Sequence, residues 1–113
     1  MRSVNMDIDD VCNAMGVSTS FKELDGQTVE ITGMMITEVD GDTITTMKDA
    51  DGETYYSGTS TPIRKTASAI LDMVTDKISD GDMKEEDFHY NVTFSEGGAG
   101  KRTYMLAKFK RIK

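Results

Sequence analysis

The chain has 113 residues, with a single proline and no tryptophan. A chain of this length can bury one hydrophobic core, so one domain spanning residues 1–113 is expected. It carries 13 basic and 20 acidic residues, a net charge of −7, and no apolar run near the ~20 residues that cross a bilayer, which excludes a membrane-spanning helix. A single cysteine excludes an internal disulfide and any metal site built on cysteine pairs, and it is typical of a reducing compartment such as the cytosol.

Residues 7–15 predict a short amphipathic helix near the start of the chain. Acidic residues occupy its first turn, where the helix dipole favours negative charge. Its apolar side chains recur at helical spacing, at Ile8, Val11, Cys12 and Met15. Cys12 and Met15 are therefore expected to be core residues that hold this helix against the domain.

Residues 27–39 predict a long strand, because apolar and polar side chains alternate there with a period of two. Gly33 within this strand predicts a bend or a β-bulge. The alternation places Met34 and Ile36 on the face opposite to the first apolar residues of the strand. There they would form an exposed apolar patch of the kind found at subunit interfaces.

Two turns that contain Asp-Gly pairs follow the long strand. The first, at 40–42, leads into a threonine-rich strand at 43–48. The second, at 49–52, leads into a strand at 53–58. Together with the long strand, these segments predict a three-stranded antiparallel meander.

A helix and a closing hairpin are predicted for the rest of the chain. A hydroxyl-rich N-cap segment and Pro62 indicate that a helix begins near residue 61, and one apolar stripe continues it to about residue 78. Alternating side chains then predict strands at 88–94 and 103–112, joined by a flexible glycine-rich loop at 95–100.

The predicted order of elements is therefore β-β-β-α-β-β, preceded by the short N-terminal helix. A meander of three strands, a helix after the third and a closing hairpin follow the order of the OB-fold, a five-stranded, partly open barrel. The expected fold class is all-β or α+β, with a five-stranded OB-fold-like barrel.

The basic residues are concentrated at the end of the chain. The last thirteen residues carry six cations and no acid, whereas the preceding hundred carry seven cations and twenty acids, a net of −13. A basic end on an acidic body is typical of a stripe that binds phosphate, of a strand that matches the acidic surface of another subunit, or of a solvated edge strand. The six cations are Lys101, Arg102, Lys108, Lys110, Arg111 and Lys113.

Segments that resemble catalytic or metal-binding motifs fail in their details. The glycine-rich segment 97–103 lacks a P-loop's first glycine, since Ser95 stands there, and Arg102 replaces the required Ser or Thr. Residues 49–52 are expected to form a turn rather than a calcium loop, and the only histidine, His89, falls on the outward face of a strand. No catalytic residue, metal site or cofactor is expected, and the chain is predicted not to be an enzyme.

Aromatic and basic residues coincide on the predicted strands. Tyr55 and Tyr56 are adjacent, so one of them must face away from the core, and Tyr104 faces outward on the last strand. Aromatic rings stack on bases while a positive groove follows the phosphate backbone, and an OB-fold binds single strands on the face of its second and third strands and on two loops. The candidate residues are Lys101, Arg102, Lys108 and Lys110 for phosphates, Lys48, Arg64 and Lys65 as outer cations, and Tyr55 or Tyr56 together with Tyr104 for bases.

The stretch from residue 24 to residue 71 resembles the small single-stranded DNA-binding proteins encoded by bacteriophages. In that family a G-x-x-V-x-I pattern opens the first strand, and a DG…YxxxS strand leads into the helix. Both patterns are present, the first at Gly26, Val29 and Ile31 and the second at Asp51, Gly52, Tyr56 and Ser60. The resemblance implies an OB-fold that binds DNA and catalyses no reaction.

The resulting hypothesis is a non-catalytic, phage-type protein that binds single-stranded DNA in replication or recombination, as a dimer or higher oligomer. A replication or recombination protein is a second expected partner, and no membrane partner is expected. The first residues contain no apolar segment of the kind that directs secretion, so a cytoplasmic location is expected, in the host if a phage encodes the chain.

Two other functions stay open at this point. The acidic body matches a small phage protein that inhibits a host nucleic-acid enzyme by presenting carboxylates in place of phosphates, and Glu85, Glu86 and Asp87 are the acids to examine first. The other function is that of a structural subunit whose exposed strand edges pair in an assembly. The sequence also leaves the choice between DNA and RNA open.

Overall fold

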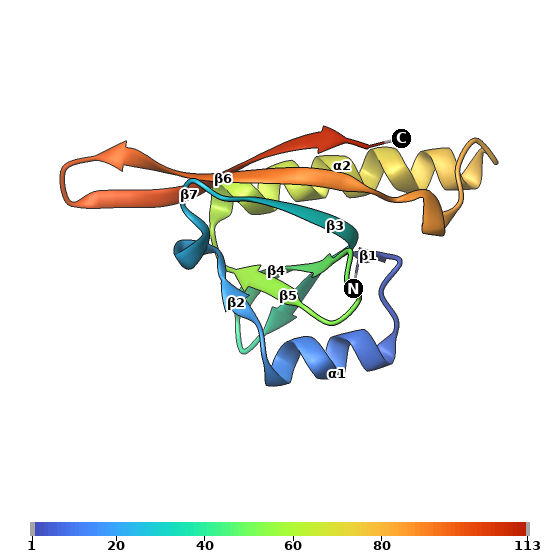
Figure 1. The fold of residues 1–113 in the computed structure, drawn as a ribbon, viewed down its shortest axis with the longest axis horizontal. Coiled ribbons are helices and arrows are strands. Elements are labelled where there is room, and N and C mark those ends of the chain that lie inside the picture. Colours follow the sequence, from blue (N-terminus) through green and yellow to red (C-terminus); the bar gives the residue numbers. More distant parts are fainter. Residues whose placement is uncertain (1, 113) are drawn as a thin grey trace.

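One sheet curls into an open half-barrel, with a long helix against its inner face and a short helix across its outer face (Figure 1). The computed structural model describes residues 2–112. The strands are β1 (Arg2–Val4), β2 (Thr19–Ser20), β3 (Thr28–Val39), β4 (Asp42–Asp49), β5 (Tyr55–Gly58), β6 (Tyr90–Ala99) and β7 (Arg102–Arg111). The helices are α1 (Ile8–Gly16) and α2 (Thr61–Ser79), with short 3-10 turns η1 (Phe21–Leu24) and η2 (Glu85–Asp87).

The bent strand β3 organises the sheet. It pairs with β4 along one edge, and along the other with β6 at 28–31 and with β1 at 34–36. A register shift between Ile31 and Gly33 bends the strand where its partner changes, which confirms the predicted bend. The strand order is β2-β5-β4-β3-β6-β7, so β2 and β7 form the two ends of the sheet.

The bulge in β3 also decides which of its side chains face the core. Ile31 faces it before the shift, and Met34 and Ile36 face it afterwards, because one extra residue moves the following side chains to the other face. Met34 is fully buried opposite Met47 of β4. The predicted exposed patch at Met34 and Ile36 is therefore wrong.

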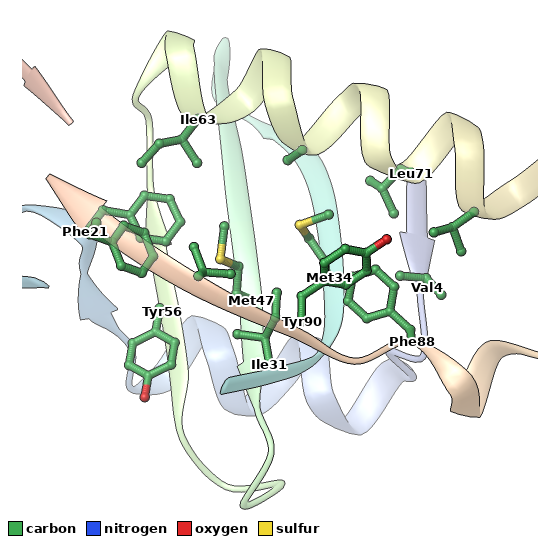
Figure 2. Close-up of a cluster of buried hydrophobic side chains, with 14 of the residues drawn as sticks. Val4, Phe21, Ile31, Met34, Met47, Tyr56, Ile63, Leu71, Phe88 and Tyr90 are labelled. Carbon is green, nitrogen blue, oxygen red and sulfur yellow. The ribbon is translucent and has the colours of Figure 1, made fainter. Parts of the chain in front are cut away.

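The core lies between the inner face of the sheet and α2 (Figure 2). Ser60 caps the helix, since its Oγ accepts a hydrogen bond from the Ile63 N–H at 3.4 Å, and Pro62 occupies the first turn as predicted. Burial of one apolar stripe then holds α2 on the sheet. The buried residues of this stripe are Ile63, Ala67, Leu71 and Val74.

β6 and β7 form a long hairpin that projects beyond the rest of the sheet (Figure 1). The two residues 100–101 make the turn, with Gly100 at a φ of +64°, and the pairing runs without a shift along both strands. The predicted flexible loop at 95–100 is wrong, because residues 95–99 gain strand partners on β7. The long axis of the molecule is 46 Å, against 27 and 26 Å for the other two.

The predicted order β-β-β-α-β-β is confirmed for β3, β4, β5, α2, β6 and β7. The expected number of five strands is wrong, because β1 and β2 bring the sheet of the described residues to seven. With three and two residues, these strands are too short for an alternating pattern to reveal them. The half-barrel is open, since β2 and β7 form the two ends of the sheet and do not pair with each other in the described residues.

The short helix α1 lies across the outer face of β3, β4 and β5 (Figure 1). Only Ala14 of this helix is buried, whereas Met15 is 74% exposed and Cys12 is exposed as well. The prediction that Cys12 and Met15 are core residues is therefore wrong. Helical spacing of apolar residues identified the helix, but the sheet covers the side that carries Val11 and Ala14.

Candidate nucleic-acid interface

The outward side of the β6–β7 hairpin and its turn carry four of the six basic residues of the chain's end. Side chains alternate along β7, so that Met105, Ala107 and Phe109 face the core, as predicted, and the residues between them face outward. We call this outward surface the hairpin face. It consists of Arg102, Tyr104, Leu106, Lys108 and Lys110, with Lys101 in the adjoining turn, and all of them are exposed.

The cations of the hairpin face have no acidic partner within residues 2–112. Across the hairpin, Lys108 pairs with Thr93 and Lys110 with Asn91, and both of these partners are uncharged. Of the other two cations of the chain's end, Arg111 lines a separate pocket and Lys113 lies outside the described residues. The ion pairs Arg2–Asp72 and Lys48–Asp10 of the described residues lie elsewhere, as does the contact between His89 and Glu30. The hairpin face therefore presents to solvent positive charge that is not neutralised by an ion pair within the described residues.

Tyr104 is the aromatic residue of the hairpin face, and it is 48% exposed. Its strand partner on β6 is Gly97. A Cβ atom at Gly97 would lie 3.0 Å from Cε2 of Tyr104 and 2.8 Å from Cδ1 of Leu106, so both side chains lie over the bare glycine backbone. The glycine thus gives the tyrosine ring a flat support and leaves the rest of the ring open to a stacking partner.

Tyr55 and Tyr56 are both buried, with 2% and 9% of their surfaces exposed. Tyr56 faces the core side, and its hydroxyl donates to Oδ1 of Asp49 at 2.8 Å. Tyr55 faces the outer side, but α1 covers it there, and its hydroxyl donates to Oδ1 of Asp10 at 2.6 Å. The expectation that one of the two is accessible is wrong. Tyr55 does face away from the core, but α1 packs on that face of β5 and buries the side chain.

Lys48 is also withdrawn from solvent by α1. Its Nζ lies 3.1 Å from Oδ2 of Asp10, and its side chain is only 15% exposed. Burial raises the pKa of Asp10, but hydrogen bonds from Tyr55, the Asp7 N–H and Lys48 outweigh burial and lower it overall. Asp10 is therefore an ionised anchor for α1, and Lys48 is engaged in this anchor rather than in a nucleic-acid surface.

Alkaline pH should weaken this anchor. Burial, and then the hydrogen bond to Asp10, raise the pKa of Tyr55 to about 12. The unfolded chain releases this proton first, near pH ~10, so the free energy of unfolding should fall as the pH rises from ~10 to ~12. Tyr55→Phe should make this fall shallower in urea unfolding experiments. Equal slopes in the wild type and Tyr55→Phe would contradict the assignment.

Arg64 and Lys65 lie in the first turns of α2, beside the base of the hairpin. The start of α2 is tied to β7, because Oγ of Ser60 donates to the Met105 carbonyl at 2.6 Å. Lys65 is exposed and Arg64 half-buried, and neither belongs to an ion pair of the described residues. The start of α2 thus lies on the core side of β7, opposite to the hairpin face, so Arg64 and Lys65 are not part of that face, and Lys48 and both buried tyrosines are separated from it as well.

The segment 49–52 forms the predicted turn. Hydrogen bonds from the Thr54 hydroxyl and from the Glu53 and Thr54 N–H groups lower the pKa of Asp51. The Asp51 carboxylate therefore stabilises the turn. Within the part of the chain that the structure describes, no group of three or more His, Cys, Asp or Glu side chains is placed to hold a metal ion. Nor do residues 2–112 include a helix that is long and apolar enough to cross a membrane.

Two residues that were not among the predicted site residues lie on or next to the hairpin face. Leu106 shares the support of Gly97 with Tyr104, and the alternation of β7 already placed it on the outward face. Lys22 lies across a groove from Tyr104. No sequence signal pointed to it, because it is an isolated lysine in a short turn, far from Tyr104 along the chain.

Comparisons of this chain with models of protein families, with curated proteins and with solved structures find no match. A functional proposal therefore depends on the geometry and charge of the hairpin face and on the resemblance in the stretch from residue 24 to residue 71.

Proposed function

We propose that this protein is a non-catalytic single-stranded DNA-binding protein and that the strand lies on the hairpin face. The main support is a projecting row of exposed cations, without acidic partners among residues 2–112, that includes an exposed aromatic ring. Cations neutralise phosphates without reading sequence, and any base can stack on an aromatic ring. A single strand suits this combination better than a duplex, whose bases are already stacked on one another.

We also propose that the half-barrel is a variant of the OB-fold. The order β3, β4, β5, α2, β6 and β7 matches that fold, and the bent β3 pairs with both β4 and β6. One loop that binds single strands in OB-folds joins the last two strands, which is the position of the β6–β7 turn. The other binding region, the face of the second and third strands, corresponds to β4 and β5, and α1 covers it here. The strand is therefore assigned to the hairpin.

The proposed role is that of a phage-type protein that protects or organises single-stranded DNA in replication or recombination. The sequence resemblance supports this role. A homo-oligomer, a dimer or larger, is part of the proposal because α1 exposes large apolar side chains that such contacts bury. These side chains are Ile8 and Met15, and Val17 directly after the helix is exposed as well.

Titration of a labelled oligo(dT) of about 30 nucleotides, followed by fluorescence anisotropy at low and moderate salt, tests the proposal. We expect binding to the single strand and little binding to a duplex of the same length. Neutralising three or four phosphates at ~0.7 each should give a slope of log K against log salt near −2 to −3. No binding to the single strand at low salt would overturn the proposal.

The acidic alternative loses support at the cluster where it was expected. Glu85 Oε1 accepts from the Asn5 N–H at 3.1 Å, and Asp87 Oδ2 accepts from the Lys84 N–H at 3.0 Å. Two of the three carboxylates of η2 thus hold neighbouring backbone, which is a structural role. A protein partner for the acidic surface becomes the leading hypothesis only if oligo(dT) fails to bind.

A further inference from the structure

A groove of about 460 Å³ lies where the curled sheet stays open. β2 and β7 are the ends of the sheet and do not pair with each other in the described chain. One wall of the groove belongs to the segment 18–22, and the other to Thr103 and Tyr104 of β7. The end of β5 and its linker to α2 connect the walls, because β5 pairs with β2 and Ser60 is bonded to β7. We call this feature the seam groove.

The floor of the seam groove is apolar and firmly packed. Phe21 lines it, and the buried ring of this residue stacks on Phe94 with the ring centroids 5.2 Å apart. Gly58 allows this position, since a Cβ atom there would lie only 2.6 Å from Cδ2 of Phe21. The floor of the groove is therefore part of the packed core.

Hydroxyl groups and one cation line the rim of the seam groove. Ser18 Oγ lies 2.7 Å from Ser57 Oγ, while Thr59 and Thr103 are exposed. The cation is Lys22, which is exposed and belongs to none of the ion pairs of residues 2–112. None of the described lining residues is acidic, although the chain carries a net charge of −7. Lysine, serine and threonine are the side chains that commonly donate to phosphate and sugar oxygens.

Tyr104 belongs both to the hairpin face and to the wall of the seam groove. We propose that a single strand lying on the hairpin face continues past Tyr104 into the seam groove, where Lys22 binds a phosphate and the rim hydroxyls contact the sugar–phosphate backbone. This inference rests on the proposed function and extends it to a second element of the binding surface. It assigns to Lys22 a role that is separate from the cations of β7.

The test compares Lys22→Gln with a matched control, Lys84→Gln. Lys84 is also exposed, and it precedes η2, at the end of the molecule opposite to the hairpin turn (Figure 1). With oligo(dT) of about 30 nucleotides, Lys22→Gln should bind threefold to tenfold more weakly, and its salt slope should be shallower by ~0.7, the share of one phosphate. Lys84→Gln should match the wild type in affinity and slope.

A second arm varies the length of the oligonucleotide. A strand short enough to occupy the hairpin face alone should bind Lys22→Gln and the wild type equally, so the defect should appear only as the oligo(dT) is lengthened. The inference is overturned if Lys22→Gln equals the wild type on the long strand, if its salt slope is unchanged, or if Lys84→Gln shows the same defect. Failure of the wild type to bind any single strand is a different result, and it removes the proposed function itself.

Discussion

Replacing Tyr104 with alanine is expected to weaken the binding of oligo(dT) by about 5-fold to 150-fold, which corresponds to the ~1–3 kcal/mol of one base–aromatic stacking contact. The ring is 48% exposed and lies over the bare backbone of Gly97, so one part of it is supported and the rest is free to receive a base. Anisotropy titrations of the wild type and Tyr104→Ala at the same salt concentration measure the difference.

Two controls separate stacking from folding in this experiment. Tyr104→Phe keeps the aromatic ring and should bind within about threefold of the wild type, since stacking needs the π-face and not the hydroxyl. The free energy of unfolding of Tyr104→Ala should change by no more than about 1 kcal/mol, because the side chain lies on the surface. Loss of affinity that is matched by an equal loss of stability would assign Tyr104 to packing of the hairpin instead.

Replacing Asp10 with alanine is expected to lower the free energy of unfolding by about 2–4 kcal/mol. Asp10 accepts hydrogen bonds from the Tyr55 hydroxyl at 2.6 Å and from Nζ of Lys48 at 3.1 Å, and the Lys48 side chain is only 15% exposed. Without the carboxylate, the Lys48 ammonium loses its ion-pair partner under α1, and the Tyr55 hydroxyl loses the acceptor at 2.6 Å. Urea unfolding at neutral pH measures the loss, and the α1 residues should show the largest increase in hydrogen exchange.

Asp9→Ala provides the matched control, because Asp9 is an exposed first-turn acid of the same helix. It should cost less than about 1 kcal/mol, the usual value of a charge near a helix N-terminus. The pKa of Asp10 is lowered in the folded protein, so its contribution is present above pH ~4 and is lost as the pH falls through the folded value. The gap between the wild type and Asp10→Ala should therefore narrow in acid. Equal stability of Asp9→Ala and Asp10→Ala would exclude the anchor.

Signals between near neighbours in the chain were enough to predict most elements and their order. Ser60 and Pro62 marked the start of α2, because capping and a fixed φ act within one turn. Along β7, the alternation correctly placed Met105 toward the core and Tyr104 toward solvent, since the period of a strand is a local property. The hairpin face, which is the main part of the candidate site, could therefore be predicted from the sequence.

Contacts between distant segments decided what the sequence pattern left ambiguous or indicated wrongly. The bulge in β3 moves the side chains that follow it to the opposite face of the sheet, so Met34 faces the core and not a subunit interface. Tyr55 sits on the face that its strand leaves open, yet α1 covers it through Asp10, a residue 45 positions away. Burial of this kind depends on where a helix docks, and no window of neighbouring residues contains that information.

The sequence by itself determined the order of the main strands and helices and the basic, outward-facing strand at the chain's end. Only the tertiary structure decided how far the sheet closes, because β2, a strand of two residues, pairs with β5 from a distant part of the chain and forms one end of the sheet, with β7 at the other end. The seam that remains brings Lys22 opposite Tyr104 across a hydroxyl-lined groove. Their position on one groove follows from contacts between segments far apart in the chain, which no window of neighbouring residues encodes.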